Sequence, residues 1–314
     1  MIHYYTGHPA EVYRQQFNDL LLAPEVTLRG LRTRELLHVV TEIPNPRDRL
    51  GIVPGRRLNP WLALSEALWL LAGRNDLTAL APYNKRIAEF SDDGKMLYGA
   101  YGYRIAGQIE PALARLRMDS ADRRAVLAIW RAEDLTAPTL DPPCNDTVMF
   151  KLRDGALHMS VFCRSNDLHW GLHAVNIVQF GILQEYLAAR LGVAFGPQLH
   201  WSDSLHIYRD GPAAEISERM VARSLEPVVA LKGAPLWADL DEWKVSPVEF
   251  VKDCSDVLDD LKYGGLAFME FADDFLRCYR ERRYGQLESC RHAKTFTDWV
   301  TLGNEFWKEK EHAD

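Results

Sequence analysis

The chain has 314 residues, of which 47% are hydrophobic and 26% are charged, and its formal net charge is -7. This charge argues against a protein that coats nucleic acid, because such a protein needs a broad basic surface. The sequence has neither a leader-like start nor an apolar run near the roughly 20 residues needed to cross a bilayer, so we expect a cytoplasmic protein without a membrane contact.

Repeats, low-complexity tracts and long Pro/Gly/Ser linkers are absent from the sequence, so we expect a single domain over residues 1–314. The chain has an odd number of widely spaced cysteines, which are Cys144, Cys163, Cys254, Cys278 and Cys290. This spacing suggests neither a disulfide framework nor a Cys-x-x-Cys zinc site, and we expect no metal. Reduced thiols are the default, and each of them is a possible nucleophile.

The first predicted helix begins at Asn59, a typical N-cap, followed by Pro60 at the first helical position. Residues 61–72 are densely apolar and end at Gly73. Glu66 lies inside this apolar segment, so its carboxylate either turns to solvent or is held in a pocket at a cost. Burial would raise the pKa of Glu66 and suit it to proton transfer.

Three strands follow in the prediction. Residues 125–130 form a short apolar run headed by Arg123 and Arg124. Residues 148–152 and 156–163 flank an Arg-Asp-Gly turn and are predicted to form a hairpin. The second hairpin strand alternates, which places Leu157, Met159, Val161 and Cys163 on one face.

Residues 176–191 carry apolar side chains at helical spacing and stop at Gly192, which indicates a long core helix. Residues 199–208 alternate as a strand that points His206 and Tyr208 to the same side. Further helices are predicted over 247–261, 266–282 and 295–311, without a pattern that indicates chemistry. The expected class is α+β, with a mixed β-sheet packed by helices including the long central helix.

Four stretches occur in an order that identifies a family: residues 64–73 around Glu66, Asp122-Arg123-Arg124, Pro143-Cys144, and residues 164–167 running on to 203–208. Together they resemble thymidylate synthase and its pyrimidine hydroxymethylase relatives over roughly residues 28–210. Asn145 stands where a His usually follows the nucleophilic Cys, and Arg-Ser-Asn-Asp replaces the commoner Arg-Ser-x-Asp. Both details resemble the hydroxymethylases, and the resemblance implies a thymidylate-synthase-like fold.

The resemblance implies an enzyme in which the Cys144 thiolate adds to C6 of a pyrimidine nucleoside monophosphate. C5 then captures a one-carbon unit from 5,10-methylenetetrahydrofolate. A guanidinium such as Arg164 would favour the thiolate, and Glu66 is the implied general acid/base. A lone Cys is otherwise a small buried hydrophobe, and a lone Glu on a helix usually faces solvent.

Phosphate binding is assigned by the resemblance to Arg123, Arg124, Arg164 and Ser165, whose guanidinium forks and hydroxyl match a phosphomonoester. The Arg-Arg pair of this family reaches the active site of the other subunit, so we expect a homodimer with arginines contributed across the interface. Arg29 is a further candidate from the N-terminal region, and Arg32 is nearly as good a choice.

His206 and Tyr208 are expected to bind the ribose 3′-hydroxyl, with Ala174 leaving space for a 2′-hydroxyl and Arg131 nearby. Asp167 resembles the carboxylate that engages the pterin of the folate and is also placed near the base. Asn176 is the expected base-binding amide. The family has its base-reading residue four positions after a Gly, whereas Asn176 lies five after Gly171, so a one-residue insertion is required.

Product and substrate are expected from the chain end and the overall resemblance. Residues 306–314 are highly charged, which is unsuited to an apolar lid, so we expect water capture and a hydroxymethyl product. The overall likeness is greatest to cytidylate hydroxymethylases of nucleoside-antibiotic biosynthesis, so CMP is the expected substrate. The alternatives are dCMP, a deoxyuridylate methylase or hydroxymethylase, and a non-catalytic relative that binds a nucleotide or RNA.

Overall fold

The computed structural model describes residues 2–236, 246–261 and 266–311. Within these residues, eight strands form one sheet in the order β1-β3-β9-β7-β6-β5, with β2 beside β3 and β8 beside β9. The strands are β1 (His3–Thr6), β2 (Glu25–Leu28), β3 (Leu31–Ile43), β5 (Val126–Ala128), β6 (Asn145–Arg153), β7 (Ala156–Cys163), β8 (Asn166–Asp167) and β9 (Ala194–Tyr208). Strands β4 (Gly51–Ile52) and β10 (Val229–Ala230) form a separate pair.

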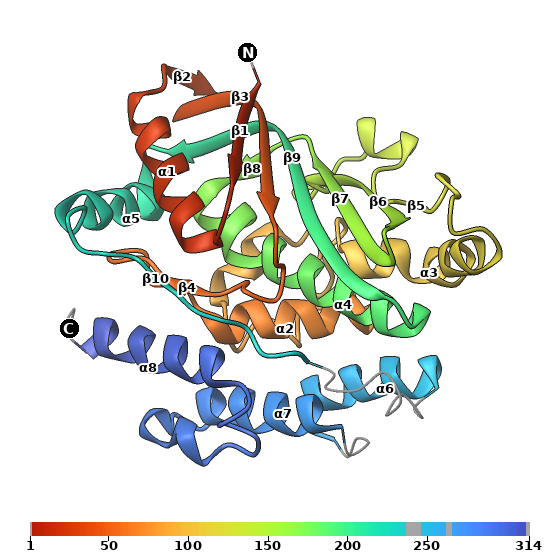
Figure 1. Cartoon of the computed structure of the whole chain (residues 1–314). Coiled ribbons are helices and arrows are strands. Elements are labelled where there is room, and N and C mark those ends of the chain that lie inside the picture. Colours follow the sequence, from red (N-terminus) through yellow and green to blue (C-terminus); the bar gives the residue numbers. More distant parts are fainter. Residues whose placement is uncertain (1, 237–245, 262–265, 312–314) are drawn as a thin grey trace.

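The sheet is mixed, because β1 pairs with β3 in parallel and both β7 and β8 pair with β9 in parallel, while the other neighbours are antiparallel. Helices pack around it (Figure 1). The α-helices are α1 (Pro9–Leu22), α2 (Pro60–Leu71), α3 (Tyr101–Met118), α4 (Ile177–Leu191), α5 (Gly211–Ala222), α6 (Pro247–Leu258), α7 (Ala267–Arg280) and α8 (Thr297–Glu311). This arrangement confirms the expected α+β class with a mixed sheet.

Helix α2 forms where the sequence predicts it. The Asn59 side chain accepts a hydrogen bond from the Leu62 amide at 3.1 Å, and Pro60 occupies the first turn. Every residue of α2 except Glu66 is buried, because α4 packs on one side and the C-terminal helices pack on the other. Glu66 is therefore the one partly exposed position on this helix.

The predicted hairpin is present as β6 and β7. Asp154 and Gly155 both have positive φ, 51° and 73°, as a two-residue turn between twisted strands requires. The alternate residues of β7 are buried as predicted, from Leu157 to Cys163. The opposite face of the sheet is only partly buried and carries Phe162 and Trp201, whose rings stack at 6.4 Å.

Helix α4 is the predicted central helix, with residues 177–188 all buried. Gly192 ends it in the left-handed conformation at φ 65°. Strand β9 begins at Ala194, five residues before the prediction, because it pairs with the start of β7. The strand predicted over 125–130 is shorter and covers only Val126–Ala128.

Several elements were not predicted from the sequence, and two of them have a clear physical reason. Strand β3 is 13 residues long, but His38 adopts φ 58° and interrupts both the pairing with β9 and the alternation of side chains. Helix α3 contains Pro111 and two glycines, which normally disfavour a helix interior. The N-terminal helix α1 was also missed.

The C-terminal helices form a layer under α2 (Figure 1). Trp61 on α2 donates a hydrogen bond to the Phe275 carbonyl at 2.9 Å and stacks on the Phe275 ring at 5.0 Å. Phe306 and Trp307 of α8 also contact the Trp61 ring. The predicted ends of these helices differ by a few residues because Asp260 and Arg282 take positive φ after α6 and α7.

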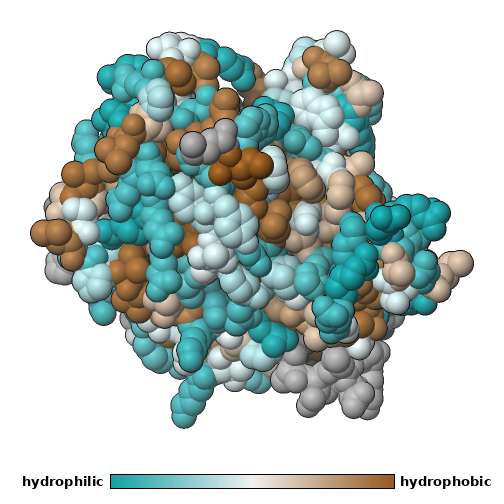
Figure 2. Space-filling model, turned by 45° about the horizontal axis from the view of Figure 1, so that its top comes forward, coloured by the Kyte–Doolittle hydropathy of each residue, from teal (hydrophilic) through white to brown (hydrophobic). Residues whose placement is uncertain are grey.

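None of the helices in the described part of the chain combines the length and the apolar character that a membrane span requires. The surface brought forward in Figure 2 mixes hydrophobic and hydrophilic patches. The expectation of one domain over residues 1–314 stays a prediction.

Candidate active site

Cys144 and Arg164 meet at the joined ends of β6 and β7. Cys144 directly precedes β6, and Arg164 directly follows β7, whose last residue pairs with Asn145. The Arg164 amide donates to the Cys144 carbonyl at 3.0 Å, and its guanidinium lies 3.9 Å from the Cys144 Sγ. Antiparallel pairing thus places a guanidinium beside the thiol that the sequence singles out.

The loop before Cys144 holds the Arg164 side chain. Arg164 donates to the carbonyl oxygens of Pro143 at 3.0 Å and Pro142 at 3.2 Å. Its guanidinium also lies over the Trp130 ring, 5.4 Å from the centroid. These contacts fix the charge near the sulfur, since three different groups define its position.

Burial raises the pKa of the Cys144 thiol above its ordinary value, although Arg164 acts in the opposite direction. Asp141, Asp146 and Asp167 add smaller contributions that also raise this pKa. The expectation that Arg164 favours the thiolate is therefore correct in direction, but burial outweighs it. A proton must be accepted from the thiol when it reacts.

Glu66 lies in the same electrostatic environment as Cys144. Burial, followed by the charge of Asp141, raises the pKa of Glu66 to about 8. Burial also raises the pKa of Asp141 to about 6, while its Oδ2 accepts a hydrogen bond from the Gly99 amide at 2.7 Å. The charge of Asp141 thus raises the pKa values of both Glu66 and Cys144.

A buried network of amides adjoins the nucleophile. Asn176 accepts hydrogen bonds from Asn145 at 3.3 Å and from Gln179 at 3.0 Å. It donates to Asn166 at 3.2 Å, and Asn166 donates to Ser202 at 3.0 Å. The Oδ1 atom of Asn145 is buried and accepts no hydrogen bond among the described residues. An unsatisfied buried acceptor is costly and is expected where a ligand or water completes the site.

The segment η3 (Leu168–Asn176) before α4 is a π-helix. At its end the Ile177 amide donates to the Leu172 carbonyl five residues earlier, instead of four as in an α-helix. A π-turn absorbs one additional residue, which is the insertion required between Gly171 and Asn176. The Gly171 position also needs a glycine, since a Cβ there would lie 2.8 Å from the Asn166 Oδ1.

Asp167, His206 and Tyr208 come together through β8 and β9. Asp167 pairs with His206 in the sheet, and the His206 and Tyr208 rings lie 5.1 Å apart. Asp167 Oδ1 accepts the Trp170 amide at 2.7 Å and so caps η3. Burial, with Asp167 and Cys144, raises the pKa of Tyr208, and Arg29 lowers it. The two rings are in contact on one strand face, as predicted, and Tyr208 lies close enough to Cys144 to feel its charge.

A family sequence model described as thymidylate synthase matches residues 25–252. The chain belongs to the thymidylate synthase family. Enzymes of this family transfer a one-carbon unit from methylenetetrahydrofolate to a pyrimidine. The matched region contains Cys144, Glu66 and the amide network, and it excludes α7 and α8.

Two similar proteins are deoxyuridylate hydroxymethyltransferases of Bacillus phage SP01 and Pseudomonas phage M6, which are 36% and 34% identical over 228 and 232 residues. These matches cover 67% and 68% of this chain, and 60% and 66% of the phage proteins. The chain thus spans less than two thirds of the length of either relative. A thymidylate synthase of Symbiobacterium thermophilum is 29% identical over 207 residues, which is 60% of this chain and 72% of that protein.

Arg29 and Arg32, the two candidate phosphate ligands of the N-terminal region, differ in their partners. Arg29 is exposed at the tip of the β2–β3 hairpin with φ 52°. Arg32 donates to Asp210 through Nε at 3.0 Å and a terminal nitrogen at 2.7 Å. Since Arg32 already holds a carboxylate, the structure favours Arg29 as the candidate phosphate ligand.

The Arg123–Arg124 pair does not reach Cys144 within one chain. The register of β5 with β6 puts Arg124 opposite Lys151, seven residues along β6 from Cys144, which is about 20 Å. Arg124 donates to both oxygens of Asp122 at 2.9 Å, and Arg123 is exposed. The predicted use of this pair in a second subunit is compatible with this distance and stays a prediction.

The structure gives little support from side-chain contacts to the predicted roles of Ser165, Ala174 and Arg131. Ser165 accepts a contact from the Cys163 thiol through its carbonyl at 3.2 Å. Ala174 is half-buried against the core, and Arg131 is exposed beside a cavity of about 310 Å³ that also contains Tyr98. Their predicted roles at phosphate and ribose stay predictions.

Sequence reasoning missed several neighbours of Cys144. Tyr101 is electrostatically coupled to Cys144, and burial raises its pKa well above the ordinary value while a hydrogen bond with Asn145 opposes this. Trp130 supports Arg164, and Asp141 raises the pKa values of Glu66 and the thiol. Asp141 lies only three residues before Cys144, so this proximity was a usable signal. The sequence carried no signal for Tyr101, because α3 brings it from a distant segment.

Proposed function

We propose that the protein transfers a one-carbon unit from 5,10-methylenetetrahydrofolate to C5 of a deoxyuridylate-type nucleoside monophosphate, with a hydroxymethyl product. The observation that carries the proposal is the approach of the Arg164 guanidinium to the Cys144 Sγ at 3.9 Å, with Glu66 in the same electrostatic environment. A thiol, a fixed cation and a carboxyl that holds its proton near neutral pH are the groups required for addition to C6 of a pyrimidine.

Cys144 acts as the nucleophile in this proposal. Its proton leaves to a base, the sulfur forms a bond to C6, and the C5 carbon becomes nucleophilic because the C5–C6 double bond has donated its electrons. Arg164 stabilises the thiolate before addition and after its release. Glu66 gives a proton to the ring oxygen and takes one back, as its pKa of about 8 allows both forms near neutral pH.

The folate supplies the carbon that becomes attached to C5. Asp167 is the residue that would hold its pterin. One oxygen of Asp167 caps the Trp170 amide, and the other accepts no hydrogen bond among the described residues, so it is free to accept the N–H groups of a pterin ring. This free carboxylate oxygen is the acceptor that the proposal assigns to the folate.

Asn176 is the proposed reader of the base. An amide donates to one carbonyl and accepts from one ring N–H, which matches uracil. The second N–H of the Asn176 amide is available for the carbonyl, and its Oδ1 exchanges the bond from Asn145 or Gln179 for the ring N–H. The two phage relatives are named for deoxyuridylate, which favours uracil over the cytosine expected from the sequence. A rotated amide also serves cytosine, so CMP and dCMP belong in the test.

After C5 has lost its proton and tetrahydrofolate has left, water adds to the exocyclic methylene carbon on C5 and the Cys144 thiolate is released from C6. Two features support this capture of water. The Asn145 Oδ1 offers a buried acceptor that can hold a water close to Cys144. Phe306 and Trp307 of α8, which begin the charged C-terminal segment, contact the Trp61 ring on α2. Residues 312–314 of that segment lie outside the described residues. Phe306 and Trp307 thus pack on α2, and the absence of a lid over the ligands is part of this proposal.

A homodimer is the proposed assembly. Large apolar side chains are exposed on sheet strands, with Tyr4 at 56%, Leu37 at 51% and Val126 at 38%. A second subunit would cover such surface and the partly buried Phe162–Trp201 pair. The same contact would bring Arg123 and Arg124 of the partner toward Cys144. Arg29, Arg164 and Ser165 complete the proposed phosphate site, with His206 and Tyr208 at the ribose.

The test is a substrate panel of dUMP, UMP, dCMP and CMP, each tritiated at C5, with methylenetetrahydrofolate and the full-length protein. Tritium release is expected to be fastest with dUMP, and mass spectrometry is expected to identify a hydroxymethyl product with tetrahydrofolate. Dihydrofolate and a methylated base would refute the hydroxymethyl assignment. Nucleotide binding without tritium release from any of the four would support the non-catalytic alternative instead.

A further inference from the structure

Two cysteines outside the active site face each other in the C-terminal layer. The Sγ atoms of Cys278 and Cys290 lie 3.7 Å apart, and both residues are buried. Cys278 is in the last turns of α7, and Cys290 follows η5 (Tyr284–Ser289), so a bond between them would close a short loop. Forming a disulfide of about 2.05 Å needs an approach of only about 1.7 Å.

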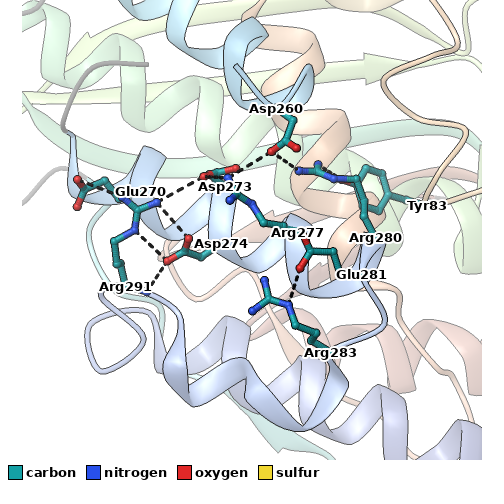
Figure 3. A network of polar contacts seen from close by, with 10 residues as sticks. All are labelled: Tyr83, Asp260, Glu270, Asp273, Asp274, Arg277, Arg280, Glu281, Arg283 and Arg291. Atoms are coloured by element: carbon teal, nitrogen blue, oxygen red, sulfur yellow. Dashed lines mark hydrogen bonds and ion pairs between the residues drawn. The ribbon is translucent and has the colours of Figure 1, made fainter. Parts of the chain in front are cut away.

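Ion pairs fix the segment that carries Cys290 to α7, and Figure 3 draws those of Arg291. Arg291, the residue after Cys290, donates to both oxygens of Asp274 at 2.9 and 3.1 Å. Asp274 lies four residues before Cys278, so both occupy the same face of α7. The ion pair between Arg291 and Asp274 holds the segment of Cys290 on this face, where Cys278 lies one helical turn after Asp274.

The electrostatics of the pair support a reactive thiol. The hydrogen bond from the Cys290 thiol lowers the pKa of Cys278, and Arg283 acts in the same direction. The Cys290 thiol, by contrast, keeps its proton. The approach of the two sulfurs to 3.7 Å allows one of them to react as a nucleophile and the other to resolve the product.

We propose that Cys278 and Cys290 form a reversible disulfide when a peroxide oxidises the protein. The Cys278 thiolate attacks one oxygen of hydrogen peroxide, an S–O bond forms, the O–O bond breaks, and hydroxide leaves and is protonated to water. Cys290 then loses its proton and attacks the Cys278 sulfur, the S–S bond forms, and a second water leaves. Two thiols are oxidised and one peroxide is reduced, and a small thiol reverses the reaction.

The disulfide joins α7 to the segment that leads into α8. Tyr284 in this loop stacks on Trp307 of α8, which in turn contacts Trp61 on α2. The bond therefore stabilises the packing of α8 on the helix that carries Glu66. This modification is independent of the proposed catalytic function.

The experiment treats the full-length protein with hydrogen peroxide, blocks free thiols in denaturant, and maps peptides by mass spectrometry. A Cys278–Cys290 linked peptide, lighter by two hydrogen atoms than the sum of its parts, is expected to form and to disappear with dithiothreitol. The oxidised protein is expected to melt about 5 °C higher than the reduced protein, because the closed loop restricts the unfolded chain. Absence of the linked peptide, or an unchanged melting temperature, would overturn the proposal.

Matched variants separate the pair from general oxidation. Cys278→Ser and Cys290→Ser are expected to lose the melting shift, whereas Cys254→Ser, which removes a buried thiol on α6, keeps it. If either pair variant fails to fold, the linked peptide of the unmodified sequence decides alone. Arg291→Gln is expected to slow disulfide formation about tenfold, with recovery in Arg291→Lys, because the ion pair with Asp274 positions Cys290. Equal rates in all three proteins would contradict the positioning role.

Discussion

The active site and the Asp273–Asp274 cluster of the C-terminal layer treat their carboxylates in opposite ways. In the site, burial raises the pKa values of Glu66 to about 8 and of Asp141 to about 6. In the layer, burial acts to raise the pKa of Asp274, but hydrogen bonds from Arg291 lower it overall. Asp273 pairs with Arg277 at 2.6 Å in the same network.

This difference separates carboxyl groups that stabilise the fold from carboxyl groups that are available for proton transfer. Asp273 and Asp274 are paired with guanidinium groups, while Glu66 near Cys144 keeps a proton that the unfolded chain would release. Groups poised for proton transfer commonly destabilise the fold, because the environment that makes them reactive also desolvates them.

The largest expected effect is on the nucleophile. Cys144→Ser is expected to lower kcat/KM by about 10⁴-fold or more, because a hydroxyl near neutral pH is a far weaker nucleophile than a thiolate. Tritium release from C5-labelled substrate measures it. Cys254→Ser is the matched control and is expected to keep its rate within about threefold. A Cys144→Ser protein with ordinary turnover would contradict the nucleophile assignment. It would also remove the reason to distinguish the active site from the C-terminal layer.

The next effect concerns the proton-transfer group. Glu66→Gln is expected to lower kcat about 10³-fold, since the amide is isosteric but cannot exchange a proton. Steady-state kinetics across pH check this. The unmodified enzyme is also expected to lose kcat/KM above pH 8, where the Glu66 proton is released. A Glu66→Gln protein with the same pH profile as the parent would assign the titration to another group.

Stability against pH sharpens the comparison further. The folded protein holds the Glu66 proton up to about pH 8, whereas the unfolded chain releases it near pH 4.5, so stability falls as pH rises through this window and is level above it. Glu66→Gln is expected to remove the fall and to be more stable than the parent by ~2 kcal/mol at pH 8.5, with little difference at pH 4. Urea unfolding at several pH values measures it, and parallel curves for the two proteins would contradict it.

The smallest effect lies in the layer. Arg277 pairs with Asp260 at 3.2 Å and with Asp273 at 2.6 Å, and its side chain is 38% exposed. Arg277→Met is expected to lower the free energy of unfolding by about 1 kcal/mol, since Arg277 is partly exposed and Arg291 still pairs with the buried Asp273, and to leave kcat/KM unchanged. Denaturant unfolding and the tritium assay check both. A large loss of activity with intact stability would show that the regions are more tightly coupled than their contacts indicate.

The sequence predicted the elements whose ends carry strong local patterns. The Asn59 cap, the Asp154–Gly155 turn and the Gly192 stop each place a boundary, because each depends on residues adjacent in the chain. Strand β3 was hidden by the break at His38, and α3 by Pro111. Those elements form because tertiary packing overrides local preference.

The same limit applied to the site. Cys144, Glu66 and Arg164 were found because each lies in a motif that the family shares. Tyr101 was not found, because its position beside Cys144 depends on how α3 packs against the β6–β7 end of the sheet. The partners of Arg164 at the Pro142 and Pro143 carbonyls were equally unpredictable, since any exposed loop offers such oxygens.

The π-helical segment before α4 has an evolutionary consequence. Each residue added to an ordinary α-helix rotates everything beyond it by about 100°, which would turn an amide such as Asn176 away from its neighbours. The wider π-helical turn of η3 takes up the additional residue. The side chains of α4 therefore keep their orientation, although each lies one position later in the sequence than it would without the insertion. Column-by-column alignment would therefore place Val175 where the proposed base-reading residue, Asn176, belongs. Substrate preference across such insertions and deletions has to be compared by spatial superposition.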